Sequence, residues 1–530
     1  MNANEHQNSQ PTAFAARSCC SHTRRTISVV NRREFVVGLG AATVFGGLAM
    51  AAASKAQDAS PRLAASAVPP TGTALRVKPA LVYQISQKRE LTSWRSYGGL
   101  KTREDVDSEA RRIEGELKNL SARSEFAIEM LPLSRVGSST EAAAVAGGDC
   151  DAILVYASGG SQAWLETLAA SKKPNIMFVR HKSGPVYLWY EIAHWRLLRK
   201  SEDTIKEPNL DVEDIVVDDY DDVLWRLRAL YGMKNALGTK VIAIGGLQAY
   251  SKPGQERGPV HAREVWKFDI QSVSNDEVGR RIKQTGADAR LVKEIQRQAD
   301  ELLSQKNLTL QTDKRFVVNT FLAAKVFKDL MTETGATCLG VGDCMGGLIR
   351  LLDTPPCLVL SLLNDEGYTA FCHTDFTHTP PGILLHHISG KPSFVSNSHF
   401  PHHGQITLAH CAAPRKMNGK DYEPTKIMTH FESDYGAATK VHYTPGQVTT
   451  NLIPNLVCTK WWGFRGKILD SPDYDMCRSQ MDVAIDGDWQ KLLREMQGFH
   501  TITCYGDYLR EVGYALKKLG IEWANVSEKV

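Results

Sequence analysis

The sequence predicts an α/β protein with two Rossmann-like parallel-sheet domains, followed by a β-rich, antiparallel barrel-like C-terminal domain. Three observations lead to this prediction. From Leu75 onward, apolar runs of strand length alternate with amphipathic helical segments, which is typical of parallel sheets with crossover helices. The same alternation starts again after an acidic linker near residues 202–213. From Pro355 the strands shorten and turns multiply, which indicates antiparallel β structure.

The chain length sets the expected number of domains. A chain of 530 residues is too long for one hydrophobic core and suggests about three domains of roughly 150 residues each. The expected parts are an export signal at residues 1–56, a linker at 57–74, a first α/β domain at 75–205, a second at 206–350 and the C-terminal domain at 351–530.

The elements of the two α/β domains are expected where apolar and amphipathic runs alternate. In the first domain, strands are expected at 79–85, 125–131, 151–157 and 175–180, with helices near 102–123, 138–147 and 161–170. In the second, strands are expected at 214–219, 240–246, 264–273 and 337–342, with helices ending near 235 and at 287–304 and 312–335. Gly245 and Gly246 follow a strand, but without a G-x-G-x-x-G motif a plain turn is favoured over a phosphate site.

Short strands dominate the expected C-terminal domain. They are PCLVLSLL, YTAFCHTD, PSFVSN, QITLAHC, TKIMTHFE, ATKVHYTP, QVTTNLI, KWWGFRGKI and HTITCYG. A helix from Asp507 to Leu519, ended by Gly520, is expected after the last strand.

The charge balance argues against one class of partner. The chain has 63 Lys and Arg against 59 Asp and Glu, and residues 1–56 hold six basic and two acidic residues, which accounts for the whole excess of four. The remainder is neutral, whereas nucleic-acid binding requires a clustered excess of positive charge. Nucleic acid is therefore not expected as a partner.

The N-terminal segment has the features of an export signal. Arg32 and Arg33 precede a weakly apolar, Gly/Ala-rich run from Phe35 to Ala53, and small residues follow. Paired arginines with a mild hydrophobic region are typical of a twin-arginine signal. The alternative is an N-terminal membrane anchor, which the glycines in the run disfavour. The sequence thus predicts a periplasmic or extracellular protein that meets the membrane only through this signal.

Cysteine usage favours free thiols over a disulfide framework. Nine cysteines lie outside the N-terminal segment: Cys150, Cys338, Cys344, Cys357, Cys372, Cys411, Cys458, Cys477 and Cys504. Their number is odd, no CxxC motif occurs, and most lie in apolar runs. Buried free thiols are therefore expected, rather than disulfides or a zinc knuckle.

A cluster of histidines marks the expected site. Eight of the sixteen histidines lie between His373 and His410, and histidine combines a near-neutral pKa with a metal-binding nitrogen. The candidate residues come at or just past the ends of apolar runs or open the last strand: His373, Asp375, Asn397, His410 and His500. Strands that end at one rim would bring these side chains together. Imidazoles with a carboxylate and an amide oxygen suit a first-row divalent metal such as zinc, manganese or cobalt.

Other histidines and one aromatic pair fit structural roles better. His386 and His387 are consecutive in a helical segment, so their side chains point about 100° apart. His402 and His403 lie in a P-H-H-G turn. Packing or surface roles are expected for these four, and His399 is left open. Trp461-Trp462 offers a sugar-stacking platform, although core or interface packing is the simpler reading.

Four segments resemble the L-fucose isomerase / L-arabinose isomerase superfamily. PPCLVLSLLNDEGYTAFCHTD resembles the family's "P-C-x-A-L…N-x-x-G…A-C-E-x-D" segment, and HISGKPSFVSN the following "T-G-x-P-x-F…D/E" segment. ITLAHCAAP resembles the strand that carries a ligand histidine in the arabinose branch. FHTITCYGDYLREVGYALKKLGIE is similar to the closing "H-H-x-x-x-x-Y-G-D…A-x-x-L-G-I" segment. The resemblance covers roughly residues 76–530 and is strongest from about 350.

The resemblance implies roles for the candidate residues. His373 occupies the position of the first acidic metal ligand and acid/base, and Asn397 that of the second acidic ligand. His410 and His500 match the two histidines of the arabinose-type site, and Asp375 matches the Asp two residues after the first ligand. Both ligand carboxylates of the family are thus replaced, which lowers the ligand charge by two and with it the expected affinity for manganese.

The expected function is metal-assisted sugar isomerisation by proton transfer. His373 or Asp375 would act as acid/base, and His373, Asn397, His410 and His500 would hold manganese or zinc. Two alternatives stay open: a non-catalytic sugar-binding protein on an isomerase scaffold, and a zinc-dependent lyase or hydrolase acting on exported glycans. The resemblance also implies a carbohydrate substrate and a homo-oligomer.

Overall fold

The computed structural model describes residues 72–95, 97–190, 198 and 209–528. The expected export signal and most of the expected linker lie outside the described residues. Within these ranges no single helix is long and apolar enough to cross a membrane. A bent pair of helices, residues 344–352 and 357–365, reaches that length and apolar composition only when the two are taken together.

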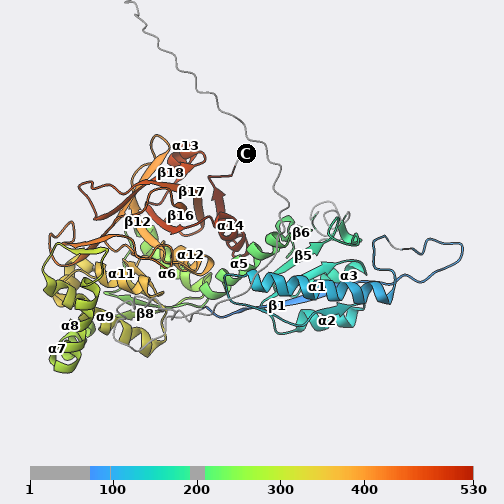
Figure 1. Cartoon of the computed structure of the whole chain (residues 1–530), viewed down its shortest axis with the longest axis horizontal. Coiled ribbons are helices and arrows are strands. Elements are labelled where there is room, and N and C mark those ends of the chain that lie inside the picture. Colours follow the sequence, from blue (N-terminus) through green and yellow to red (C-terminus); the bar gives the residue numbers. More distant parts are fainter. Residues whose placement is uncertain (1–71, 96, 191–197, 199–208, 529–530) are drawn as a thin grey trace, which may run out of the picture. The chain divides into compact units, whose positions relative to one another are not determined.

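The first sheet is parallel and has the order β2-β1-β4-β5-β6, with β3 also paired to β1 (Figure 1). Its strands are β1 (Leu75–Val82), β2 (Ile128–Met130), β3 (Ser134–Val136), β4 (Ala152–Ala157), β5 (Asn175–Val179) and β6 (Ile215–Val217). The helices between and after them include α1 (Arg103–Arg123), α2 (Ser139–Gly147), α3 (Gln162–Ala169) and α5 (Tyr220–Ala236). Every pairing in this sheet is parallel, as the alternation of apolar runs and helices predicts.

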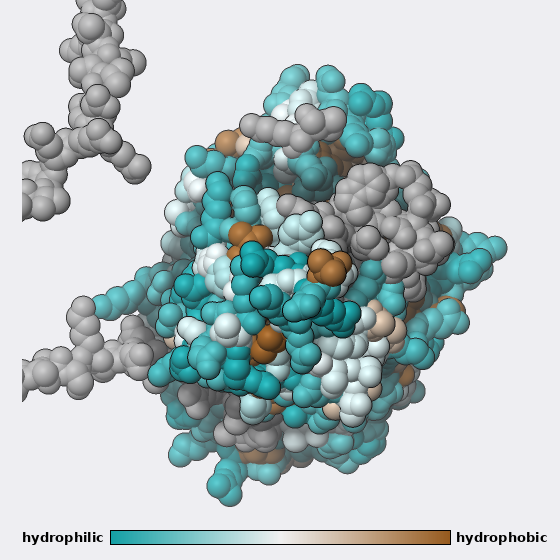
Figure 2. Space-filling model, turned by 90° about the vertical axis from the view of Figure 1, so that its right-hand side faces the viewer, coloured by the Kyte–Doolittle hydropathy of each residue, from teal (hydrophilic) through white to brown (hydrophobic). Residues whose placement is uncertain are grey.

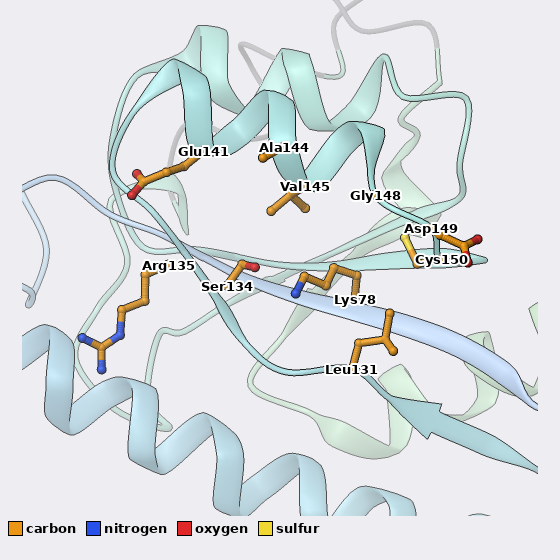
Figure 3. A pocket seen from close by; sticks show the side chains of 10 residues that line it. All are labelled: Lys78, Leu131, Ser134, Arg135, Glu141, Ala144, Val145, Gly148, Asp149 and Cys150. Atoms are coloured by element: carbon orange, nitrogen blue, oxygen red, sulfur yellow. The ribbon is translucent and has the colours of Figure 1, made fainter.

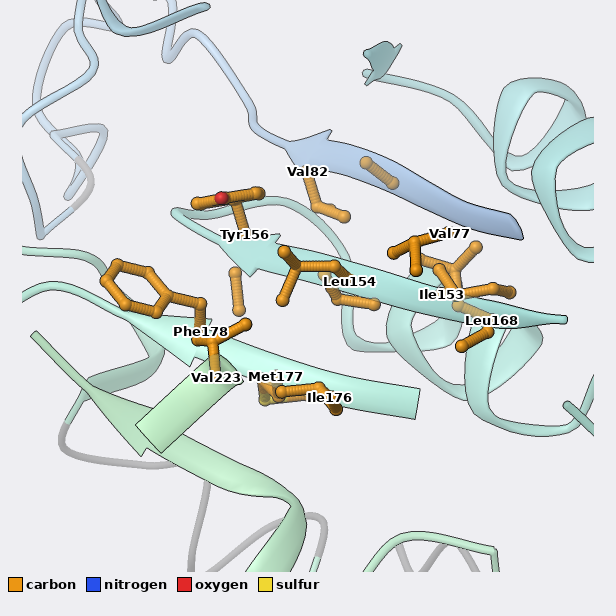
Figure 4. Packing of buried hydrophobic residues seen from close by; sticks show 14 of the residues in the cluster. Val77, Val82, Ile153, Leu154, Tyr156, Leu168, Ile176, Met177, Phe178 and Val223 are labelled. Carbon is orange, nitrogen blue, oxygen red and sulfur yellow. The ribbon is translucent and has the colours of Figure 1, made fainter. Parts of the chain in front are cut away.

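Continuous apolar runs form the centre of this sheet because both of its faces are covered. All residues of β4 and β5 are buried. Figure 4 shows side chains of these two strands, such as Leu154 and Phe178, packed among Val82 of β1 and Val223 of α5. The face of the molecule drawn in Figure 2 is mostly hydrophilic, with apolar residues in small separate spots.

The second sheet is also parallel and has the order β11-β10-β7-β8. Its strands are β7 (Lys240–Ile244), β8 (Asp269–Val273), β10 (Cys338–Val341) and β11 (Thr369–Cys372). Its helices include α6 (Lys252–Glu264), α7 (Asn275–Ala287), α8 (Ala289–Leu303), α9 (Lys314–Thr334), α10 (Ile349–Leu352), α11 (Cys357–Asp365) and α12 (Thr379–Ser389), and the π-helix η3 (Cys344–Leu348). A separate small sheet consists of β9 (Leu308–Leu310), β14 (Thr425–Met428) and β15 (Ala438–Val441). None of its strands pairs with a strand of the second sheet.

The C-terminal region forms a closed antiparallel barrel of six strands, as its short strands predict. They are β12 (Phe394–Ser398), β13 (Gln405–His410), β16 (Val448–Pro454), β17 (Lys460–Asp470), β18 (Ser479–Asp486) and β19 (His500–Tyr505). The order β16-β19-β12-β13-β18-β17 closes through the pairing of β17 with β16. The barrel region also includes β20 (Glu522–Asn525), parallel to β17, and helices α13 (Trp489–Glu495) and α14 (Leu509–Lys518).

One expected strand is a helix. The run PCLVLSLL was expected as a strand, but residues 357–365 form α11, all nine of them buried. A short apolar run reads the same in a buried strand and in a buried helix. Leucine favours the helix, and the run has only one β-branched residue, Val359.

Three other expected strands differ in extent or in sheet. YTAFCHTD was expected to reach Asp375 within the β-rich domain, but β11 ends at Cys372 and pairs with β10 in the second parallel sheet. DIVVDD was expected to open the second α/β domain, but β6 pairs with β5 at the edge of the first sheet. The expected strand 264–273 is confined to β8, because Glu264 still belongs to α6. The chain therefore passes from the first sheet to the second near residue 240, and from the second sheet to the barrel near residue 394. The expected positions were near 205 and 350.

Candidate functional site

The predicted site residues come from two parts of the structure that meet. His373 directly follows β11 of the second parallel sheet, whereas Asn397, His410 and His500 lie on the barrel strands β12, β13 and β19. Asn397 and His500 are direct partners in the antiparallel pair β12–β19, so their side chains lie on the same face. A shared cluster of buried apolar residues from both parts holds β11 against these strands.

Four histidine rings gather at this junction. The ring centroids of His373 and His410 are 6.4 Å apart, those of His373 and His500 6.0 Å, and those of His378 and His500 4.9 Å. In each of two groups of three side chains, one possible ligand atom from every residue lies within 4.8 Å of the others: Cys372, His373 and His410, and Asp375, His378 and His500. The predicted residues thus converge, but they are divided between two neighbouring groups.

The second group is the more deeply buried. Asp375, His378 and His500 expose 2%, 0% and 4% of their surface. Oδ2 of Asp375 lies 3.8 Å from Nδ1 of His500, and Oδ1 accepts a hydrogen bond from the Thr377 N–H at 2.9 Å. The carboxylate is therefore fixed beside the imidazole and away from solvent.

Several buried polar atoms here have no hydrogen-bond partner within the described part of the chain. They are Oδ1 of Asn397, Nε2 of His500 and both ring nitrogens of His378. Leaving a buried polar atom unpaired costs about 1–3 kcal/mol, so such atoms are rare without a reason. A divalent cation would satisfy them, because imidazole nitrogens with carboxylate and amide oxygens are suitable ligands for zinc and for manganese. The residues present therefore fit the metal that the resemblance implies.

Burial keeps three of the imidazoles neutral. Burial lowers the pKa of His378 and of His500 well below its usual value, and neighbouring histidines lower it further. Burial likewise lowers the pKa of His410 to about 4. Neutral imidazole is the form that carries a lone pair for a metal ion.

A backbone hydrogen bond determines which ring nitrogen of His410 carries the proton. The Ala412 N–H donates to Nδ1 of His410 at 3.1 Å. A neutral imidazole carries one ring proton, so this bond places the proton on Nε2. Nε2 of His410 is then a hydrogen-bond donor, which suits contact with a substrate oxygen better than the ligand role expected from the sequence.

His373 is held in an unusual backbone conformation. Its φ is +69°, a left-handed conformation that non-glycine residues adopt rarely and mostly at functional positions. The His373 N–H still donates to Val341 O at 2.8 Å. A Cβ on Gly340 of β10 would lie only 3.0 Å from His373 O, so the glycine leaves room for this turn. The strained turn directs the partly exposed imidazole toward the other histidines.

An exposed aromatic ring lies beside the histidines. Tyr250, in the segment between β7 and α6, is 67% exposed. Its ring centroid lies 5.9 Å from those of His373 and His500 and 4.9 Å from that of Phe499, all edge to face. No sequence pattern points to this residue, because the segment that carries it follows β7, more than a hundred residues before the histidine cluster. Tyr250 and Phe499 offer an apolar ring surface next to polar ligands.

The structural roles expected for other residues are confirmed. His386 and His387 lie on α12, and Nδ1 of His386 donates to Lys391 O at 2.9 Å. His402 lies in the turn between β12 and β13 and contacts Phe400 O. Trp461 and Trp462 are 1% and 2% exposed, so they are core residues and not a sugar platform.

His378 is the site residue that sequence reasoning missed. It lies three residues after Asp375 in the segment that leads into α12, outside any strand. The one available signal was its place among eight clustered histidines. Its approach to His500 depends on contacts between the parallel sheet and the barrel, which periodicity does not reveal.

A cavity of about 330 Å³ lies elsewhere, beside α2 (Figure 3). None of the predicted site residues lines it. Its polar side chains already have partners: Lys78 Nζ donates to Pro132 O, Arg135 pairs with Asp107, and Glu141 accepts from the Gly137 N–H and from Ser138 Oγ. The cavity therefore offers few free groups to a ligand.

Comparison of the chain with known protein families and with curated proteins found no match.

Proposed function

We propose that this protein is a metal-dependent carbohydrate isomerase, similar to the L-fucose and L-arabinose isomerases, that moves a proton between C1 and C2 of an aldose. The observation that carries the proposal is the group of buried, unpartnered nitrogen and oxygen atoms around His378, His500 and Asn397. They lie where the carboxyl end of β11 meets the barrel. In open parallel sheets, ligands bind at the carboxyl ends of the strands.

In this proposal four side chains hold the metal. They are Asp375, His378, His500 and Asn397, the last through its amide oxygen. A bound divalent metal would polarise the sugar carbonyl. This ligand set holds one carboxylate, so zinc is favoured over manganese by its preference for nitrogen.

His373 is the proposed acid/base. Its ring is partly exposed at the rim of the site, whereas Asp375 is buried against His500. His373 accepts a proton from one sugar carbon and returns it to the neighbouring one, and the lone pair of its neutral form makes this possible. Nε2–H of His410 donates to the sugar oxygen on which negative charge develops. Tyr250 covers the apolar face of the ring.

The two parallel sheets support the inference of two Rossmann-like domains. We place the boundary between these two domains after α5 and not at residue 205, because β6 pairs with β5 in the first sheet. We further infer export by the twin-arginine route to the periplasm or beyond and assembly as a homo-oligomer. The arginine pair and the resemblance support these two inferences.

Metal content and proton exchange together test the proposal. The protein is purified, its metals are measured by elemental mass spectrometry, and it is incubated with a panel of aldoses in deuterated water. About one equivalent of a divalent metal and deuterium at C1 or C2 of one sugar, seen by NMR, are expected. His500→Ala should lose the metal, whereas His386→Ala, a histidine of α12, should keep it.

Other results would favour the alternatives. A sugar that binds without exchange, in protein that holds no metal after reconstitution, contradicts the isomerase and indicates a sugar-binding protein. Zinc with cleavage of a glycan, and no exchange at C1 or C2, indicates a lyase or hydrolase.

A further inference from the structure

Five cysteines come together beside the site histidines. Cys357, Cys372 and Cys411 are buried in one apolar cluster, and Cys344 and Cys477 pack against it. All nine cysteines of the described ranges are free thiols, as expected, but their spacing in the sequence gives no sign of this gathering. Cys344 is hydrogen-bonded to Cys372, and Cys477 to Cys411.

Each of these two pairs adjoins a site histidine. Cys372 precedes His373, and Cys411 follows His410. The pairs therefore lie at two of the points where the parallel sheet and the barrel contribute to the site. The geometry of the pair at the barrel, Cys411 and Cys477, supports a specific proposal.

The barrel brings Cys411 and Cys477 side by side. His410 at the end of β13 is the direct partner of Ser479 at the start of β18, so the two chain segments leave the barrel together. The Arg478 N–H donates to Sγ of Cys411 at 3.4 Å. The register that pairs His410 with Ser479 puts Arg478 opposite Cys411, so Cys477 is the residue next to the facing position, and the Arg478 N–H contact holds Sγ of Cys411 beside it.

A metal shared by these thiols is a poorer fit. His430 also contacts the sulfur of Cys411. However, Cys411, Cys477 and His430 are not one of the groups, within the described chain, whose ligand atoms all lie within 4.8 Å of one another. The geometry therefore favours a bond between the two sulfur atoms over an ion held by three side chains.

We propose that Cys411 and Cys477 form a reversible disulfide that restrains the segment holding His410. Cys477 is partly exposed while Cys411 is buried, so Cys477 is the thiol that a reagent reaches first.

The bond forms by thiol–disulfide exchange with a low-molecular-weight disulfide. Cys477 passes its proton to the Cys411 sulfur, to which it is hydrogen-bonded, then attacks that disulfide, forms a mixed disulfide and releases one small thiol. The Cys411 sulfur then attacks Sγ of Cys477 and releases the second small thiol. The protein loses two hydrogens, and the oxidant gains them as two thiols.

The disulfide has a consequence for the site. The Ala412 N–H, one residue beyond Cys411, donates to Nδ1 of His410. Joining Cys411 to the start of β18 fixes the backbone that makes this hydrogen bond. The structure with free thiols already makes this hydrogen bond, so oxidation adds a restraint that holds the His410 ring in the orientation that presents Nε2–H.

Peptide mapping tests the bond directly. The purified full chain is treated with oxidised glutathione or with dithiothreitol, unfolded, alkylated and digested without reduction. After oxidised glutathione, a peptide pair joined through Cys411 and Cys477 is expected in the mass spectrum. After dithiothreitol, both cysteines should carry the alkyl group.

Variants and a stability measurement support the mapping. Cys477→Ser should abolish the joined peptides, whereas Cys150→Ser in the first sheet region should keep them. The urea midpoint of the wild type should rise on oxidation, and that of Cys477→Ser should not. Two alkylated cysteines after oxidation of the wild type, or Cys411 joined to Cys357 instead, would overturn the proposal. The mapping needs no metal or sugar, so it separates this proposal from the proposed function.

Discussion

Asn397 lies opposite His500 with its amide oxygen buried and unpartnered. An aspartate has nearly the same shape and would place a negative charge at the same point. Asn397→Asp is therefore expected to raise the affinity for Mn²⁺ about tenfold, or roughly 1.4 kcal/mol, measured by calorimetric titration. Asn397→Leu is the matched control and should weaken binding. Equal affinities in the two variants would show that position 397 does not contact the metal.

His373 is the group proposed to move the proton. Removing a general acid/base lowers the rate by about 10²–10⁴-fold, so His373→Gln should lower deuterium exchange into the sugar by at least about a hundredfold. Its metal content should not change, because His373 is not among the proposed ligands. The control is His403→Gln in the turn before β13. A variant that exchanges at the wild-type rate would exclude His373 as the base.

At the scale of elements, the sequence predicted the parallel sheets and most barrel strands correctly. Runs such as DAILVYA are strands because five or six consecutive apolar residues fit a strand that is buried on both faces. The strand β18 was missed, although its sequence SQMDVAID alternates apolar and polar residues in part. Its polar residues Gln480 and Asp482 are themselves buried, which hides the pattern.

Candidate site residues could be predicted from the sequence where they lie at the ends of strands. Those that are placed by contacts between distant segments could not. His410 and His500 lie at the end and start of barrel strands, as expected, and His373 follows β11. The left-handed turn at His373 and the position of His378 depend on contacts between the two sheets. The tautomer of His410 depends on one backbone hydrogen bond. Such contacts between distant segments leave no periodic signal in a sequence.

Helix α12 carries a pH dependence. Burial, helped by the adjacent His386, lowers the pKa of His387 to about 3. A histidine with a lowered folded-state pKa binds its proton more readily in the unfolded chain, so stability falls as pH drops from 6.5 toward 3. The slope is up to about 1.4 kcal/mol per pH unit for each such group.

The matching measurement is urea unfolding between pH 7 and pH 4. His387→Leu should flatten the fall in unfolding free energy relative to the wild type. An identical slope in both proteins would mean that His387 is protonated in the folded state.

Two glycines give opposite expectations for substitution by alanine. A Cβ on Gly463 of β17 would overlap the ring of Trp523 on β20, so Gly463→Ala should destabilise by about 1–3 kcal/mol. Gly115 lies on the exposed face of α1 with no atom within 4 Å of a Cβ, so Gly115→Ala should stabilise by up to about 1 kcal/mol. Thermal unfolding measures both, and a shift of the same sign in the two variants would contradict the packing of β20.

At the scale of the whole molecule, one buried carboxylate joins the edge of the first sheet to α14 near the end of the described chain. Asp214, before β6, accepts hydrogen bonds from Tyr514 Oη at 2.6 Å and from Lys518 Nζ at 2.6 and 2.8 Å. Asp214 is 0% exposed. Asp214→Ala should cost about 3 kcal/mol, because it leaves these donors uncompensated.

The neighbouring pair provides the control. Glu213 and Lys517 form an ion pair at the surface, and exposed pairs contribute at most about 1 kcal/mol. Glu213→Ala should therefore lower the unfolding free energy by less than about 1 kcal/mol. A comparable loss in both variants would show that the buried contact does not join α14 to the first sheet.

The packing of α14 on α5 (Figure 1) also has a consequence for synthesis. The Tyr514 and Trp225 rings meet edge to face at 5.7 Å, and Tyr514 leaves the ribosome almost three hundred residues after Trp225. One side of α5 therefore stays open to chaperones during about half of translation. A transport route that accepts only folded cargo would thus respond to whether the last helix has docked.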